Sequence, residues 1–115
     1  MRSLLLIGVL ALGLAAVSRP AAAANVRMYV RHEVTSYTAW RKAYDSFDAT
    51  RRKMGVIAQA VYQSLADPND ITVTHDFASA NQAKAFAGPA ELKAAMQKAG
   101  VKGTPQIWFT TRAAN

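Results

Sequence analysis

The chain has 115 residues, of which 51% are hydrophobic and 18% are charged, and its formal net charge is +7. This composition supports one globular domain with its own core and excludes a disordered chain. There is no cysteine, which excludes disulfides, thiol catalysis and cysteine-ligated metals. The basic residues are spread along the sequence, so nucleic-acid binding is not expected.

The first 24 residues differ from all that follow. Arg2 precedes a charge-free apolar run from Leu4 to Val17, and the small-residue stretch 21–24 closes the segment. This order is typical of a signal peptide, because the run is shorter than the roughly 20 apolar residues of a transmembrane helix. We expect cleavage after Ala24, which leaves a periplasmic or secreted domain of residues 25–115 without stable membrane insertion. An uncleaved N-terminal anchor is the alternative.

The first part of this domain predicts a strand followed by a helix. Residues 28–34 alternate in character and indicate a half-buried strand with Val30, His32 and Val34 on one face. Thr35 or Ser36 is a suitable N-cap for a helix that ends at Gly55. Apolar residues recur in this helix at helical spacing and form one stripe. The stripe contains Trp40, Ala43, Tyr44 and Phe47.

A hairpin follows. Strands at 57–65 and 71–77 flank the run 66–70, whose Asp-Pro-Asn sequence is a strong turn signal. Pairing the strands about this turn sets Tyr62 opposite His75, so the hairpin predicts that both side chains lie on one face of the sheet.

The last part predicts a broken helix and a final strand. Ser79 opens a helix with a capping box, Gly88-Pro89 interrupts it, and it resumes until Gly100. Residues 104–111 are rich in β-branched and aromatic side chains and indicate a strand.

The order of elements is therefore βαββαβ. Two right-handed crossovers around a hairpin generate a ferredoxin-like α+β fold, with a four-stranded antiparallel sheet in the order 4-1-3-2 and two helices on one face. The other face of the sheet is left open, and a second copy of the chain would cover it. We expect a homodimer of the α+β barrel type.

A set of positions across nearly the whole mature domain matches a known pattern. These positions are Val30-Arg31-His32, Trp40, Asp48, Arg52, Gly55, Tyr62, Asp67-Pro68-Asn69, Phe86, Glu91-Leu92, Ala95-Met96, Ala99-Gly100-Val101 and Gly103. In them the chain resembles small uncharacterised bacterial proteins described as cyclase-like or antibiotic-biosynthesis-monooxygenase-like. The resemblance implies the dimeric α+β barrel fold and a pocket between sheet and helices. In relatives, this pocket hosts cofactor-free oxygenation, polyketide cyclisation or haem cleavage.

Both histidines of the chain are predicted on one face of neighbouring strands. A histidine in an apolar pocket titrates near neutrality and can abstract a phenolic or enolic proton. We predict His32 as the catalytic base, and the resemblance supports this because polyketide-cyclase-type relatives place a histidine in a Val-x-His pattern in the first strand. A tyrosine hydroxyl, such as that of Tyr62 or Tyr44, would orient the substrate oxygen. The predicted ligand pocket consists of Trp40, Tyr44, Phe47, Tyr62, His75 and Phe86.

Other interpretations of these residues stay open. The histidines and the aromatic stripe would equally suit a packed core. No metal is expected, because strand alternation points Glu33 and Asp76 away from His32 and His75. No cofactor is expected either, since the residues that cleave haem in relatives lack a match. The absence of a phosphate loop and of a nucleophile elbow excludes nucleotide hydrolysis and serine-hydrolase chemistry.

Two functions remain. The first is binding of a small apolar or aromatic metabolite, with cofactor-free monooxygenase or cyclase chemistry. The second is a non-catalytic dimeric interaction module of the periplasm, whose interior would be tightly packed.

Overall fold

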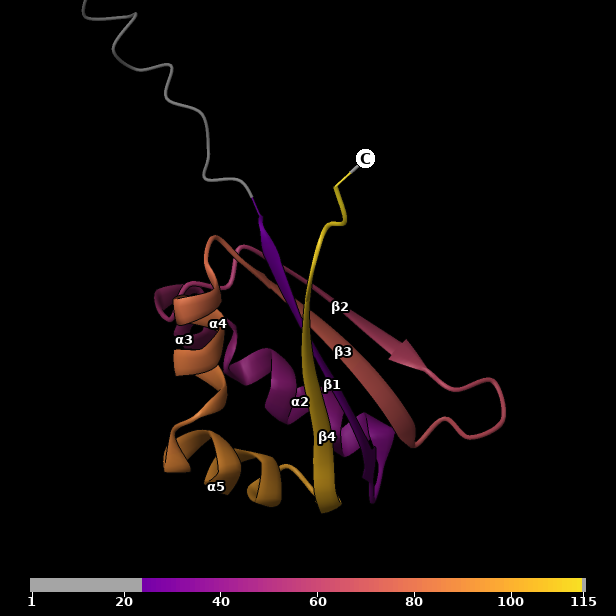
Figure 1. The fold of residues 1–115 in the computed structure, drawn as a ribbon. Helices are drawn as coiled ribbons and strands as arrows, with labels where there is room; N and C mark the ends of the chain where they lie inside the picture. The colour runs from indigo at the N-terminus through magenta and orange to yellow at the C-terminus, as the bar shows by residue number, and fades with distance from the viewer. Residues whose placement is uncertain (1–23, 115) are drawn as a thin grey trace, which may run out of the picture.

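One antiparallel sheet of four strands forms a layer, and all the helices cover a single face of it (Figure 1). The computed structural model describes residues 24–114, so the predicted signal peptide lies almost wholly outside the described residues. The elements are β1 (Val26–Val34), α2 (Tyr37–Ser46), α3 (Asp48–Lys53), β2 (Ala58–Gln63), β3 (Asp70–Phe77), α4 (Ala80–Ala87), α5 (Ala90–Lys98) and β4 (Val101–Thr111). The strand order β2-β3-β1-β4 confirms the predicted ferredoxin-like topology. Within the described part, no helix is long and apolar enough to cross a membrane.

The first helical segment is divided, where the sequence predicts one continuous helix. The Ser36 hydroxyl accepts a hydrogen bond from the Ala39 backbone amide and caps α2 as expected. At the other end the Ser46 hydroxyl donates to the Ala43 carbonyl, and the Phe47 amide donates to the Tyr44 carbonyl three residues back. These bonds tighten the last turn, so α2 ends and α3 begins on the other side of Phe47.

The register of the β2-β3 hairpin differs from the predicted one. Gln59 lies opposite His75, and Tyr62 lies opposite Thr72. The turn is larger than expected because Asp67 organises it, accepting hydrogen bonds from the backbone amides of Asn69 and Asp70. The pairing is thereby shifted by an odd number of residues, which moves Tyr62 to the opposite face of the sheet. The prediction that Tyr62 shares a face with His75 was wrong.

Strand β4 is longer than predicted and carries an irregularity opposite His32. Its pairing with β1 shifts between Arg31 and Glu33, which lie opposite Gln106 and Lys102. The extra residues of β4 include Gly103, whose φ of +66° is a conformation that favours glycine. A bulge of this kind bends the strand and changes the direction of nearby side chains.

The core consists of two clusters on the covered face. One contains Met28, Val30, Val56, Phe77, Ala83 and Phe86, and the other contains Val34, Trp40, Tyr44, Ile71 and Val73. The alternation predicted for β1 is confirmed, because Val30, His32 and Val34 are all buried against the helices.

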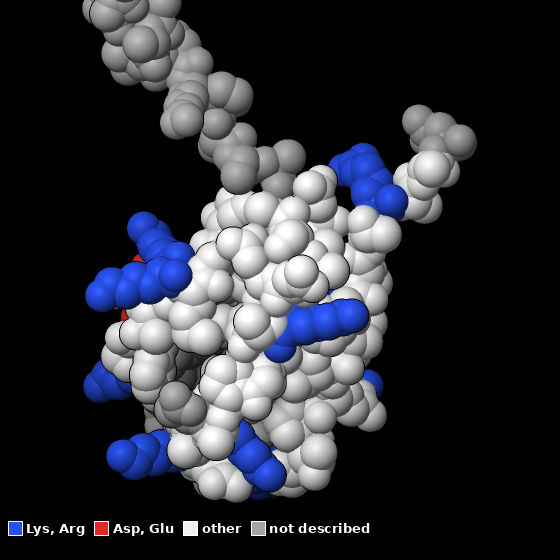
Figure 2. Space-filling model, turned by 60° about the vertical axis from the view of Figure 1, so that its left-hand side comes forward, with Lys and Arg blue, Asp and Glu red and all other residues white. Residues whose placement is uncertain are grey.

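Charge is divided unevenly between the two layers. The helices carry eight Lys and Arg residues against three Asp and Glu residues, whereas the strands carry three of each. Figure 2 shows this helix side, on which Lys and Arg side chains project at several places. The fold therefore gathers the positive charge that is spread along the sequence.

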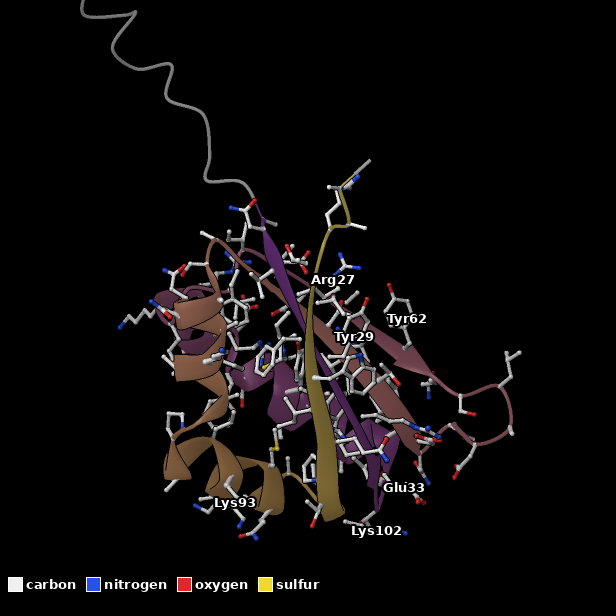
Figure 3. The ribbon with its side chains drawn as sticks, viewed as in Figure 1. Arg27, Tyr29, Glu33, Tyr62, Lys93 and Lys102 are labelled. Atoms are coloured by element: carbon white, nitrogen blue, oxygen red, sulfur yellow. The ribbon has the colours of Figure 1, made fainter. Side chains whose placement is uncertain are left out.

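The open face of the sheet carries exposed aromatic side chains. Tyr29 and Trp108 stack with parallel rings whose centroids lie 5.0 Å apart. Tyr62 projects from the same face and is 55% exposed (Figure 3). This surface has the aromatic content that protein interfaces favour.

Candidate functional site

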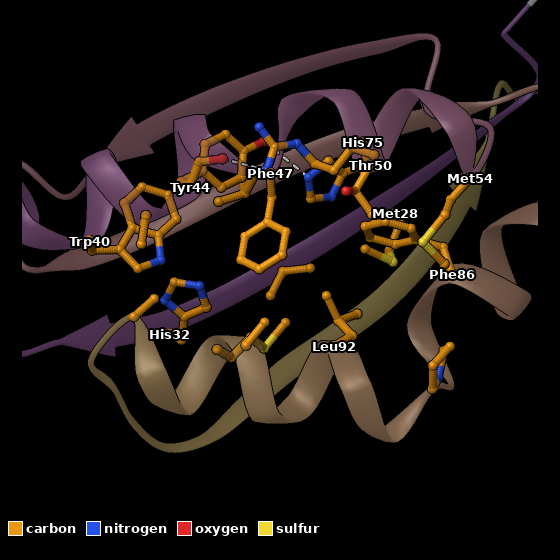
Figure 4. A pocket seen from close by; sticks show the side chains of 18 residues that line it. Met28, His32, Trp40, Tyr44, Phe47, Thr50, Met54, His75, Phe86 and Leu92 are labelled. Atoms are coloured by element: carbon orange, nitrogen blue, oxygen red, sulfur yellow. Dashed lines mark hydrogen bonds between the residues drawn. The ribbon is translucent and has the colours of Figure 1, made fainter.

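A cavity of about 340 Å³ lies between the sheet and the helices (Figure 4). Its volume falls within the range of small-molecule sites. Phe47 and Met54 line it and are also exposed to solvent, so the cavity opens on the helix side. Its walls are mostly apolar. The lining residues are Met28, Val30, His32, Trp40, Ala43, Tyr44, Phe47, Thr50, Arg51, Met54, Val73, His75, Phe86, Pro89, Leu92, Ala95, Met96 and Ala99.

The structure brings together all but one of the residues predicted for the pocket. Those that line the cavity are His32, Trp40, Tyr44, Phe47, His75 and Phe86. Tyr62 is the exception, because the hairpin register places it on the open face. Tyr44 is therefore the predicted tyrosine that remains available to orient a substrate.

His75 and Tyr44 form a hydrogen-bonded pair in the cavity wall. The Tyr44 hydroxyl oxygen lies 3.0 Å from His75 Nε2, and both side chains are buried. Burial, with a smaller contribution from the positive charge of Arg51, lowers the pKa of His75 to about 4. Burial also raises the pKa of Tyr44 to about 12, although Arg51 opposes this. At neutral pH the pair is therefore uncharged and can hold a substrate oxygen through hydrogen bonds.

His32 lies beside Trp40, at the other side of the cavity in Figure 4. The two rings meet edge to face with centroids 5.6 Å apart. Burial lowers the pKa of His32 below its usual value of 6.5, so the imidazole is neutral at pH 7. Its Nδ1 atom is buried and has no hydrogen-bond partner in the part of the chain that the structure describes. A neutral imidazole in an apolar pocket is suited to accept a proton.

Arg51 is a cavity residue that the sequence analysis did not single out. The Arg51-Arg52-Lys53 cluster resembles an exposed helix end, yet Arg51 is only 5% exposed. Its guanidinium carbon lies 3.6 Å from the centre of the Tyr44 ring, and Nη1 donates to the Tyr44 carbonyl oxygen. The helical spacing of Trp40, Tyr44, Phe47 and Arg51 is the signal that would have placed it on the buried stripe.

The cavity contains no group of metal ligands. Among residues 24–114, no cluster of three or more His, Cys, Asp or Glu side chains could hold a metal ion. The polar atoms of the walls belong mainly to His32, Tyr44, Arg51 and His75. This set is suited to hydrogen bonding and proton transfer.

Several solved structures share this fold. An oxygenase of Streptomyces nogalater, SnoaB, described as cofactor-independent, is 10% identical, covers 81% of this chain and 97% of its own, and has a TM-score of 0.64. A Bordetella bronchiseptica protein provisionally described as an antibiotic biosynthesis monooxygenase is 11% identical over 80% of this chain and 100% of its own, with a TM-score of 0.67.

A third structure contains a ligand. The monooxygenase from the gene ActVA-Orf6 of Streptomyces coelicolor, in complex with nanaomycin D, is 16% identical over 80% of this chain and 90% of its own, with a TM-score of 0.58. No protein-family model matches the chain, and neither does any curated protein. The chain is therefore a ferredoxin-like α+β protein with the fold of the antibiotic biosynthesis monooxygenases, as the resemblance predicted.

Proposed function

We propose that this domain binds a small aromatic molecule in the cavity between sheet and helices and transforms it without a cofactor, with His32 as the base. The cavity itself carries the proposal, because its apolar walls surround two neutral histidines. A non-catalytic module with a tightly packed interior would not leave about 340 Å³ at this place.

The chemistry begins with removal of a proton. His32 takes a phenolic or enolic proton, while Tyr44 and His75 hold the substrate oxygen on which negative charge develops. The resulting electron-rich anion can react with dioxygen, as the description of SnoaB as a cofactor-independent oxygenase suggests for this fold. The same deprotonation would start a cyclase-type condensation, which consumes no dioxygen.

The test is dioxygen uptake with a panel of hydroxylated polycyclic aromatic compounds. We expect His32→Ala to lower turnover about 100-fold or more, in line with general base catalysis. Activity should persist below pH 6.5, because burial lowers the pKa of His32, and should fall as the imidazole becomes protonated.

Two tyrosines provide a matched control. Tyr44→Phe should impair turnover, whereas Tyr62→Phe on the open face should not. Unchanged turnover in a folded His32→Ala chain would remove His32 from the mechanism. Product formation without dioxygen uptake would favour the cyclase reaction.

The cellular setting and the assembly are parts of the same proposal. The leader-like residues 1–24 support export to the periplasm. The exposed aromatic side chains of the open face support pairing with a second copy of the chain.

A further inference from the structure

Arg51 is a buried cation with an incomplete set of partners. Its Nε donates to Gln59 and its Nη1 donates to the Tyr44 carbonyl, but Nη2 has no hydrogen-bond partner within the described residues. Among the described side chains, Asp48 provides the nearest carboxylate: its Oδ1 lies 3.7 Å from Nη2, which is within ion-pair distance but beyond hydrogen-bond distance. Asp48 is also shared with Arg52, whose Nε lies 3.1 Å from it. Buried charges in proteins are normally paired, so a guanidinium that lines the cavity and shares its carboxylate with Arg52 can attract a further anion.

The charge of the helices around the cavity also favours an anionic ligand. The helices that frame the opening hold the whole net charge of residues 24–114, with eight basic against three acidic residues. Such a surface raises the local concentration of anions and speeds their association. In Figure 2, Lys and Arg side chains project from several places on this side of the molecule.

A row of ring contacts connects Arg51 to His32. The guanidinium lies over Tyr44, Tyr44 stacks on Trp40 at 4.8 Å, and Trp40 meets His32 at 5.6 Å. An aromatic ligand lying along this row would have its anionic end at Arg51 and its reacting end at His32. Arg51 would thereby act as an anchor that sets the orientation of the ligand.

Resting on the proposed function of the cavity, we propose that its ligand is an aromatic carboxylic acid, bound as the carboxylate through Arg51. Arginine recognises carboxylates by charge-assisted hydrogen bonds, which are stronger than those between neutral groups. The neutral histidines then interact with the hydroxyl group of the ligand, whereas Arg51 balances the negative charge of its carboxylate.

The test compares two probes of the same shape, 2-naphthoate and 2-naphthamide, by the quenching of Trp fluorescence. On the wild-type chain we expect the carboxylate to bind about tenfold more tightly than the amide, and we expect added salt to reduce this preference. Arg51→Gln should abolish the preference while amide binding changes little. Arg51→Lys should retain part of it.

Lys53→Gln is the matched control, because it removes the same charge from an exposed side chain two residues further on in α3 and leaves the Asp48 contacts in place. It should leave the preference nearly unchanged. Equal binding of the two probes to the wild-type chain would overturn the carboxylate proposal and leave the pocket intact. An undiminished preference in Arg51→Gln would overturn the role of Arg51. Failure of both probes to bind would instead contradict the proposed function.

Should Arg51→Gln unfold, the wild-type and Arg51→Lys chains still decide the question. A preference that Arg51→Lys weakens, and Lys53→Gln does not, supports the anchor. A preference that neither change affects contradicts it.

Discussion

The two faces of the sheet differ in whether their polar side chains have hydrogen-bond and ion-pair partners. On the open face, β1 and β3 are joined by two bidentate ion pairs. Arg27 pairs with Asp76, and Arg31 pairs with Asp70. On the covered face, the same two strands contribute His32 and His75, and each histidine has a buried Nδ1 atom for which the described residues provide no hydrogen-bond partner. Strand alternation separates the two sets although they are neighbours in sequence.

This difference singles out the residues of the proposed site more clearly than residue type does. Within residues 24–114, the buried side-chain nitrogen and oxygen atoms that lack a partner belong to three residues, His32, Arg51 and His75. All three line the same cavity. Unpaired buried polar groups are costly and uncommon in native proteins, so their concentration beside one cavity supports the proposed site.

The largest expected effect tests the contrast in packing between the faces. Phe77→Ala removes a fully buried ring of the covered face and should lower the free energy of unfolding by about 3–5 kcal/mol. Tyr62→Ala on the open face should change it by only about 0.5 kcal/mol in the monomer. Urea unfolding at two protein concentrations measures both and separates any contribution of self-association. Similar losses for the two variants would contradict the contrast.

A smaller effect should appear on acidification. The pKa of His75 is about 4 in the folded chain, whereas the unfolded chain takes up the proton near 6.5. Stability contributed by the neutral ring is therefore complete above pH 6.5 and is lost as the pH falls towards 4, by roughly 3 kcal/mol in total.

His75→Phe isolates this contribution. The difference in unfolding free energy between wild type and variant should change over the same pH interval, because other titrating groups are common to both chains. A difference that is independent of pH would show that His75 is not held neutral by burial.

The smallest effect concerns the open face. Trp108→Ala removes one ring of the Tyr29–Trp108 stack, and if this face pairs with a second copy, self-association should weaken about tenfold. Analytical ultracentrifugation of wild type and variant measures the dissociation constant. A wild-type chain that is monomeric would exclude a dimer formed through the open face.

Much of the fold and part of the site could be predicted locally. The alternation of β1 placed His32 on the covered face, and the stripe of Trp40, Tyr44 and Phe47 placed three aromatic residues over it. Both predictions depend on residues a few positions apart, whose relative directions are set by the geometry of a strand or a helix.

The hairpin register and Arg51 show where local reasoning fails. The position of Tyr62 depended on how Asp67 organises a turn, and an error of an odd number of residues reverses the face. A basic residue near a helix end is usually exposed, so the burial of Arg51 over Tyr44 could be recognised only once the helix was packed on the sheet.

The sequence by itself therefore determined the order of the elements and the faces on which their periodic residues lie, because these follow from backbone geometry within each element. Only the tertiary structure decided that the space between the layers stays open, that Arg51 borders it, and that the helices with the net positive charge cover it. These properties depend on how side chains from distant segments fill, or fail to fill, a shared volume.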